Sequence, residues 1–188
     1  MLAFDSKKTA LVLIDLQEGI IANNFAPYRS DVVVAKGKVL AEQFRQVGAS
    51  VVLVNVGWDA CYANTPKGAV DQPSQRPEGG LPAGWMDLTP GLAQEGDLRV
   101  TKHQWGAFTG TGLDLELRRR GIETIVMGGI ATNMGVESTV RHGWELNYNM
   151  VVVEDACSAF TVEQHQMAID VIFPRIAQVV RSDGFTFA

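Results

Sequence analysis

The segment TALVLID at residues 9–15 indicates the fold class of this chain. Residues 10–14 are apolar without a break, whereas a strand with one face in water would alternate apolar and polar side chains. Such a run is typical of a strand that is covered on both faces, as in a parallel sheet. Five further β-branched runs follow along the chain: SVVLVNV (50–56), DLRVT (97–101), ETIVMGGI (123–130), NMVVVED (149–155) and AQVVR (177–181). The sequence therefore predicts a six-stranded, mainly parallel sheet.

Predicted helices alternate with these strands and comprise residues 30–47, 111–120, 133–146 and 163–173. Gly48 and Gly121 follow the first two helices where a carboxyl-terminal cap is expected. Pro174 is expected to close the last helix, because proline cannot continue the hydrogen-bond ladder. The β-α-β alternation predicts an α/β protein, a three-layer α/β/α sandwich with a Rossmann-like sheet.

Length and composition favour one domain. The chain has 188 residues, of which 46% are hydrophobic. A folded unit of this size buries roughly 70% of its unfolded surface, so it needs no disulfide or metal to supply a core. We expect residues 1–188 to form a single domain. Its two cysteines, Cys61 and Cys157, are expected to be free thiols in a reducing compartment.

The charge balance argues against nucleic acid as the main partner. The net charge is −5 and the isoelectric point is about 5.2. The basic run RRR (118–120) ends a predicted helix, where a solvated cap is favoured over a phosphate site. The first residues, MLAFDSKKTALVLIDLQ, have no cationic leader before a long apolar segment, and no later run approaches membrane-spanning length. We expect a cytoplasmic protein that binds neither nucleic acid nor membranes.

A long stretch at residues 57–96 is rich in proline and glycine and contains Trp58, Tyr62 and Trp85. It is too long for a simple crossover inside a compact domain. Loops of this kind are usually lids, binding loops or contacts to a partner.

Candidate site residues are expected at the carboxyl ends of the strands, because ligands of open α/β sheets bind there, near the reversal of strand order. Asp15 ends the first predicted strand, Lys102 follows the third, and the turn at residues 130–135 follows the fourth. An acid at the end of an apolar strand must find a partner or be protonated. Asp15 and Lys102 are therefore the leading candidates, and the alternative is a structural ion pair or helix cap.

The turn GGIATNMG (128–135) precedes a predicted helix. Backbone N–H groups between Ala131 and Gly135 are expected to point outward at the positive end of the helix dipole, an arrangement suited to an oxyanion or carboxylate. The alternative is an ordinary helix cap by Thr132 or Asn133.

Three ordered motifs carry a resemblance to a known family: LVLIDLQ (11–17), TKHQWGAFTGTGLDLELRRRGIETIVMGGIATNMGVEST (101–139) and VVVEDACSAF (151–160). From about residue 8 to about residue 181 the chain resembles the isochorismatase-like hydrolases, also called the cysteine hydrolase superfamily. The resemblance implies strand order 3-2-1-4-5-6, a catalytic Asp15 and Lys102, and a cis peptide at Ile130-Ala131. The family nucleophile, a cysteine, falls on Gly135, as in bacterial members of unassigned activity.

That departure affects the expected mechanism. An amidase of this family needs a thiolate, and glycine has no side chain with which to attack. Isochorismatases are similar to this chain in having glycine there; they protonate the methylene carbon of a vinyl ether from the Asp, and water then attacks the oxocarbenium ion. In this interpretation Asp15 is the general acid, which requires a pKa raised by burial, whereas Lys102 lowers it.

The family's metal-binding members carry an Asp-x-His type motif after the second strand. Here that region reads VNVGWDACY (54–62), with Asp59 but no histidine. We predict no catalytic metal and no other cofactor.

Several other side chains are secondary candidates for the site. Aromatic residues expected around the crevice can stack on a cyclic substrate or merely pack the loops. Gln17 can contact substrate or hydrogen-bond the backbone. The two cysteines are expected to be inert packing residues rather than nucleophiles. His103 is expected to pack or to be exposed, and the other histidines receive no role. The aromatic candidates are Phe25, Trp58, Trp105 and Phe108, and the histidines are His103, His142 and His165.

The leading hypothesis is a small-molecule hydrolase that forms no covalent intermediate and acts on a vinyl ether or a related small carboxylate. The alternative is a catalytically silent member that binds a small molecule after losing its nucleophile. Retention of both Asp15 and Lys102 weighs against that alternative, because charged crevice residues without a task cost stability. A purely structural oligomer leaves both charges unexplained, although a homo-oligomer, a dimer or larger, is itself expected.

Overall fold

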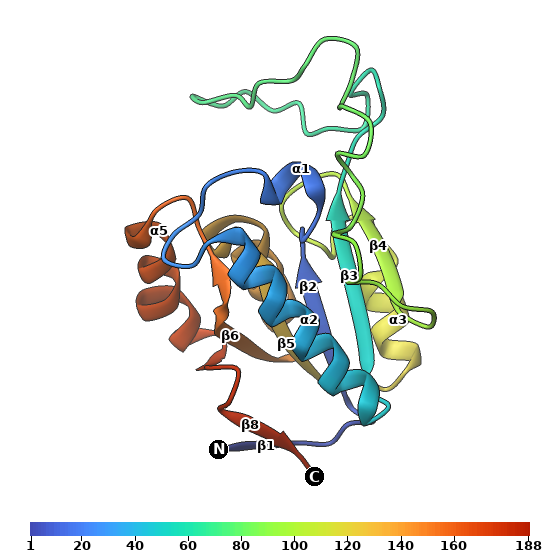
Figure 1. The fold of residues 1–188 in the computed structure, drawn as a ribbon, viewed down its shortest axis with the longest axis vertical. Helices are drawn as coiled ribbons and strands as arrows, with labels where there is room; N and C mark the ends of the chain where they lie inside the picture. Colours follow the sequence, from blue (N-terminus) through green and yellow to red (C-terminus); the bar gives the residue numbers. More distant parts are fainter.

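The computed structural model describes residues 1–188 and contains a six-stranded parallel sheet of order β4-β3-β2-β5-β6-β7 (Figure 1). Numbered along the chain within this sheet, the order is 3-2-1-4-5-6, as predicted, and every pair is parallel. The strands are β2 (Thr9–Ile14), β3 (Ser50–Val56), β4 (Leu98–Lys102), β5 (Thr124–Ile130), β6 (Asn149–Ser158) and β7 (Gln178–Val180).

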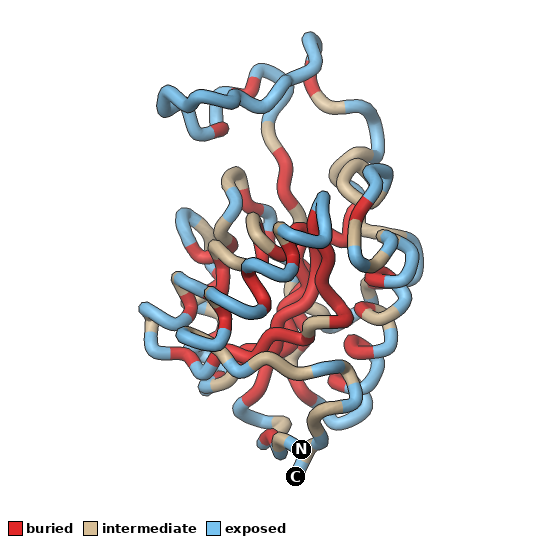
Figure 2. The backbone as a smooth tube through the Cα atoms, turned by 90° about the vertical axis from the view of Figure 1, so that its left-hand side faces the viewer, coloured by how far each residue is buried: buried red, intermediate tan, exposed pale blue.

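Both faces of the sheet are buried, which explains the unbroken apolar runs. Along β2, Ala10, Val12 and Ile14 belong to one hydrophobic cluster, whereas Leu11 and Leu13 belong to a second cluster on the opposite face. The first cluster is covered by α3 (Leu113–Arg119), α4 (Glu137–Glu145) and the final helical segment; the second is covered mainly by α2 (Ser30–Gln46). The red interior of Figure 2 is this buried sheet.

The predicted helix ends at Gly48 and Gly121 are confirmed. These residues have φ of +71° and +67°, the left-handed conformation that glycine adopts at a carboxyl-terminal cap.

The prediction of one continuous helix at residues 163–173 is wrong, because the segment consists of three successive helical pieces. The chain forms α5 (Val162–Met167), then a π-helical turn (η2, Ala168–Ile172), then a 3₁₀ turn (η3, Phe173–Arg175). Pro174 lies inside η3 rather than beyond the helical segment, because its missing N–H is tolerated in the first turn. The predicted helix at 133–146 is likewise divided, into a π-helical turn η1 (Thr132–Val136) and α4.

Three short elements were not predicted. The strands β1 (Leu2–Phe4) and β8 (Phe185–Phe187) pair in parallel and bring the two ends of the chain together (Figure 1). Their phenylalanines pack with Phe44 of α2, whose ring centroid lies 4.9 Å from that of Phe187. The helix α1 (Glu18–Ile21) follows β2 directly. Elements of three or four residues are too short to show a periodic pattern.

The long segment at residues 57–96 contains no helix or strand and extends away from the sheet (Figures 1 and 2). Residues 66–79 are all exposed. Contacts within the segment nevertheless stabilise it. The Tyr62 hydroxyl donates to the Pro77 carbonyl at 3.1 Å, and the Arg76 guanidinium carbon lies 5.8 Å from the Tyr62 ring centroid. Nowhere in the fold is there a helix with the length and apolarity required to traverse a bilayer.

Gly129 allows β5 to approach β2 at the carboxyl edge of the sheet. Its φ is +122°, and a β-carbon there would lie 2.2 Å from the Ile14 carbonyl oxygen. The pairing of β5 with β6 also shifts register between Met127 and Gly129. Both features set the position at which β5 ends and the following turn begins.

We predict that Gly129→Ala destabilises the fold by about 3–5 kcal/mol, because backbone atoms of two strands would have to separate. Gly48→Ala is the matched control, with positive φ but open space around the added methyl, and should cost only about 1–2 kcal/mol. Urea unfolding of both variants measures the difference. Equal losses would show that the contact with Ile14 is unimportant.

Candidate active site

Asp15 and Lys102 meet at the carboxyl edge of the sheet, as predicted. Asp15 follows β2, and Lys102 is the last residue of β4, with β3 between these two strands. The Lys102 Nζ lies 2.7 Å from Asp15 Oδ2, and the side chains are only 2% and 8% exposed. Lys102 also donates to the Gln104 carbonyl at 3.2 Å. The two charges therefore form a buried, hydrogen-bonded ion pair.

The backbone of Asp15 has an unusual conformation for a residue other than glycine. Its φ is +54°, and its N–H donates to the Val54 carbonyl of β3 at 2.8 Å. Aspartate is among the residues that tolerate the left-handed region best. Such conformations cluster at functional sites, where surrounding contacts hold them. Here the neighbouring strand holds Asp15 where β2 ends.

The carboxyl group of Asp15 has mixed electrostatic surroundings. Burial raises its pKa to about 6, and the nearby Lys102 ammonium opposes that rise. Its second oxygen, Oδ1, is buried without a hydrogen-bond partner. This carboxyl group can hold a proton in mildly acidic solution, and its Oδ1 is not engaged by any other group of the protein.

The turn after β5 contains the predicted cis peptide at Ile130-Ala131. Ala131 is the residue that precedes η1, and its carbonyl accepts N–H groups from Met134 and Val136 at 3.1 and 3.2 Å. No side chain caps this turn, so the alternative of an ordinary Thr132 or Asn133 cap is not observed. Asn133 Oδ1 is instead buried without a partner.

Gly135 lies directly against the carboxyl group of Asp15. A β-carbon at position 135 would be 3.3 Å from Asp15 Oδ2 and 3.4 Å from the Trp105 carbonyl oxygen. It would also be 2.9 Å from Ile14 Cγ2, closer than real β-carbons approach. A side chain at position 135 would therefore compete for space with Ile14, the Asp15 carboxyl group and the Trp105 carbonyl.

Gln17 occupies a fully buried position at the base of the long loop. Its amide donates to the carbonyls of Val56 and Trp85 at 2.9 and 3.2 Å, and its carbonyl accepts the Val56 N–H at 2.7 Å. Of the two roles considered, this placement favours the backbone one. Gln17 ties the end of β3 to the loop.

The aromatic candidates divide into different environments. Trp58 is partly buried at the loop base, where its Nε1 donates to the His103 carbonyl at 2.7 Å, whereas Trp105 is 58% exposed. Phe25 packs against Phe160, with ring centroids 5.0 Å apart. Phe108 was expected beside the crevice but lies in the hydrophobic core.

Neither thiol is placed as a nucleophile beside Asp15. Cys157 is fully buried on β6, and burial strongly raises the pKa of its thiol. Cys61 is exposed on the long loop, where its Sγ lies 3.2 Å from Asp59 Oδ1. The structure contains no group of three or more His, Cys, Asp or Glu side chains arranged to hold a metal ion.

One site neighbour was missed by sequence reasoning. His165, to which no role was assigned, is fully buried, and its Nδ1 lies 2.9 Å from the Thr132 hydroxyl in η1. No sequence signal pairs these residues, because they lie 33 positions apart, in the π-helical turn η1 and in the helix α5.

Known proteins share the sequence pattern and the fold of this chain. Residues 9–184 match the isochorismatase domain family. The chain belongs to the isochorismatase family. An isochorismatase family protein of Escherichia coli O157:H7 is 52% identical over 180 residues, covering 95% of both chains. A solved isochorismatase family protein from Burkholderia thailandensis is 42% identical, with a TM-score of 0.92, covering 98% of this chain and 96% of that one.

A more distant family member has a name that states a reaction. The ureidoacrylate amidohydrolase of Stutzerimonas stutzeri (strain A1501) is 34% identical over 177 residues, covering 82% of this chain and 71% of that protein. The isochorismatase family thus includes hydrolases, and the chain is an isochorismatase-family hydrolase in this broad sense.

We predict that Lys102→Met raises the pKa of Asp15 above about 6, because desolvation would then act without an opposing charge. A carboxyl group whose folded-state pKa is raised loses its stabilising contribution as pH rises through that pKa. The variant should therefore lose more stability at pH 8 than at pH 5, approaching about 3–5 kcal/mol where Asp15 is ionised.

NMR titration of the Asp15 side chain and urea unfolding at the two pH values measure these effects. Lys8→Met is the matched control, since Lys8 forms an exposed ion pair with Glu123 at 2.9 Å, and its loss should change stability little at either pH. An unchanged Asp15 pKa in Lys102→Met would show that the two groups are not coupled.

Proposed function

We propose that this isochorismatase-family protein hydrolyses a small vinyl ether, or a related small carboxylate, without a cysteine nucleophile. The observation that carries the proposal is the buried Asp15 carboxyl group, which is paired with Lys102 through one oxygen and has no partner at the other. In this proposal Oδ1 carries the proton that reaches the substrate, and Gly135 lies beside the same carboxyl group, on the side of Oδ2.

The chemistry requires one proton donor and one water molecule. Asp15 protonates the methylene carbon of the vinyl ether, and the electrons of the double bond form the new C–H bond. Water then adds to the oxocarbenium ion and returns one proton to Asp15. The resulting hemiketal breaks its bond to the ether oxygen, which leaves as an alcohol after taking up a proton, while the hemiketal hydroxyl gives up its proton and becomes the ketone carbonyl. Lys102 favours the first step, because its attraction to Asp15 is strongest once the carboxyl group has become a carboxylate. An anionic substrate would also be attracted to the ammonium.

The surroundings of Asp15 support a mechanism without an acyl-enzyme. Gly135 occupies the position that the family resemblance gives to the nucleophile, and it has no reactive group. Cys157 is buried and its raised pKa disfavours the thiolate, while Cys61 lies on the projecting loop. In this proposal Ala131, Asn133 and Gly135 line the substrate position, and Trp58 and Trp105 flank it.

We further propose that the protein acts in the cytoplasm without a metal or other cofactor, on a small molecule rather than on nucleic acid, as a single domain spanning residues 1–188. A homo-oligomer is proposed because several apolar side chains on and around α5 are exposed, among them Phe160, Met167 and Val171.

We predict that the protein turns over isochorismate, and that Asp15→Asn lowers kcat/KM at least about 100-fold by removing the proton donor. Detection of the released keto acid measures the reaction. Asp97→Asn is a matched control, because Asp97 is also a buried acid in an ion pair, with Arg45 at 2.6 Å, but precedes the amino end of β4. Binding without turnover would instead support a silent binding protein, and turnover of simple amides would contradict the absence of a nucleophile.

The pH dependence of the same reaction distinguishes a general acid from a general base. If Asp15 must be protonated, kcat/KM falls about tenfold per pH unit above about pH 6, where the carboxyl group loses its proton. A rise through this range would show that Asp15 acts as a base.

A third prediction concerns the space at Gly135. Both Gly135→Ala and Gly135→Cys should lower vinyl ether turnover about 10-fold or more, because a β-carbon presses on Ile14 and approaches Asp15. Only the cysteine variant should gain reaction with an alkylating reagent, measured by mass spectrometry in a Cys61→Ser background. Full activity of Gly135→Ala would show that this space is not used.

A further inference from the structure

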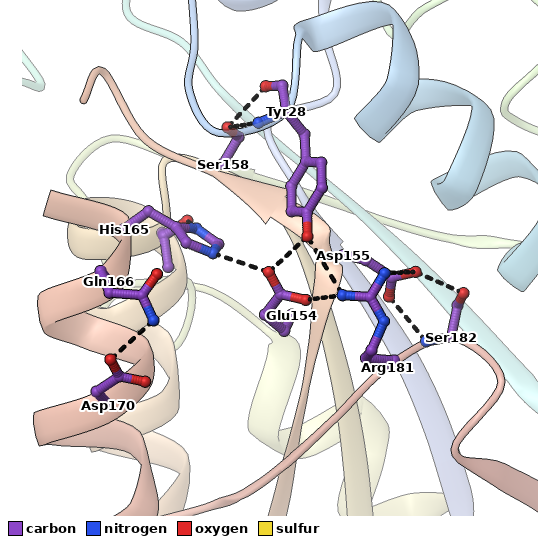
Figure 3. A network of polar contacts seen from close by, with 10 residues as sticks. Tyr28, Glu154, Asp155, Ser158, His165, Gln166, Asp170, Arg181 and Ser182 are labelled. Atoms are coloured by element: carbon purple, nitrogen blue, oxygen red, sulfur yellow. Dashed lines mark hydrogen bonds and ion pairs between the residues drawn. The ribbon is translucent and has the colours of Figure 1, made fainter. Parts of the chain in front are cut away.

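A chain of polar side chains connects the turn of the candidate site to the protein surface; Figure 3 shows its course from His165 through Glu154 to Arg181. It begins at Thr132, the first residue of η1, whose hydroxyl lies 2.9 Å from His165 Nδ1. Both residues are fully buried. His165 Nε2 lies 3.3 Å from Glu154 Oε1, on β6. Three elements, η1, α5 and β6, are thus joined through one imidazole ring.

The partners of Glu154 determine which ring nitrogen carries the proton. Glu154 accepts the Tyr28 hydroxyl at 2.7 Å on Oε1 and Arg181 at 2.7 Å on Oε2. A carboxylate paired with arginine is an acceptor, so the contact with His165 requires a proton on Nε2. In the neutral ring Nδ1 is then the acceptor, and the Thr132 hydroxyl is the donor.

This contact is close to the reacting groups. Thr132 follows the Ile130-Ala131 peptide, and Gly135, three residues later in the same turn, lies against the carboxyl group of Asp15. A displacement of η1 would therefore alter the space in which a substrate meets Asp15. Errors of about 1 Å in such placements can cost a reaction about 100-fold.

We propose that His165 is a positioning residue, whose unprotonated Nδ1 accepts the Thr132 hydroxyl and thereby holds η1 in place beside Asp15. The catalytic part of this proposal rests on the function proposed above. When His165 is protonated, Nδ1 becomes a donor, so the Thr132 hydroxyl must turn from donor to acceptor and the hydrogen bond that ties η1 to α5 reverses its direction.

The groups around His165 favour its neutral form near neutral pH. Burial lowers its pKa below the ordinary value, whereas Glu154 and, more weakly, Asp170 oppose the shift. The ring centroid of Tyr28 lies 6.0 Å from that of His165. Arg181, which follows β7, pairs with the Glu154 carboxylate. Protonation is therefore confined to acidic solution. The value of kcat/KM should consequently fall at low pH, where His165 becomes protonated, as well as at high pH, where Asp15 loses its proton.

The test compares His165→Gln with His165→Phe. Glutamine can present Oε1 to the Thr132 hydroxyl and Nε2 to Glu154, but it does not titrate. His165→Gln should retain turnover and lose the acidic limb of the kcat/KM profile. His165→Phe should lower kcat about 10- to 100-fold, with a smaller change in KM. A residue that only stabilises the fold would change the unfolding midpoint and leave the pH profile unaltered, and that result would overturn the proposal. So would an acidic limb that persists in His165→Gln.

A measurement without substrate separates this proposal from the proposed function. NMR of the ¹⁵N-labelled protein should show His165 protonated on Nε2. The amide signals of Ala131, Thr132 and Asn133 should titrate with the same midpoint as the ring, and Thr132→Val should abolish this coupling whereas Thr132→Ser preserves it. Coupled titration in a protein without turnover would contradict only the proposed function. A proton on Nδ1, or a ring that titrates without affecting the turn, would overturn the role of His165.

Discussion

Two opposite charges in a nearly water-free interior make the strongest demand on this fold. Asp15 and Lys102 are 2.7 Å apart and almost unexposed. Either charge alone would cost several kcal/mol in that environment, so each depends on the presence of the other. The parallel sheet meets this requirement, because β2 and β4 end at the same edge on either side of β3. The left-handed backbone of Asp15 and its hydrogen bond to Val54 complete the placement.

The turn after β5 determines what the ion pair can do. Gly129 lets β5 run tightly against β2, and the π-helical turn then brings Gly135 against the carboxyl group. π-helical turns are rare and often occur at functional sites. Because Gly135 has no side chain, the turn places no nucleophile beside the Asp15 carboxyl group and its ammonium partner. The His165 ring contacts the same turn through Thr132, and Glu154 of β6 contacts the other side of that ring.

Some parts of this structure could be predicted from the sequence and others could not, and the reasons are physical. Strands covered on both faces must be apolar at every position, so β2, β3 and β5 could be recognised from composition alone. The family resemblance supplied the strand order, whereas Asp15 and Lys102 were indicated first by their places at the strand ends and then by the resemblance. By contrast, β1 and β8 are too short for a pattern. The irregular helical turns around Pro174 depend on tertiary packing that helix propensity does not report.

The sequence by itself determined the layered α/β architecture, the aspartate and the lysine at the strand ends and the absence of a thiol at position 135, because these follow from residue type and order. Only the tertiary structure decided which polar side chains are already engaged in hydrogen bonds within the protein. Gln17 is bound by backbone groups of β3 and the loop, and His165 faces Thr132 from another helix. Such pairings depend on the directions of side chains in space, which spacing along a chain does not specify.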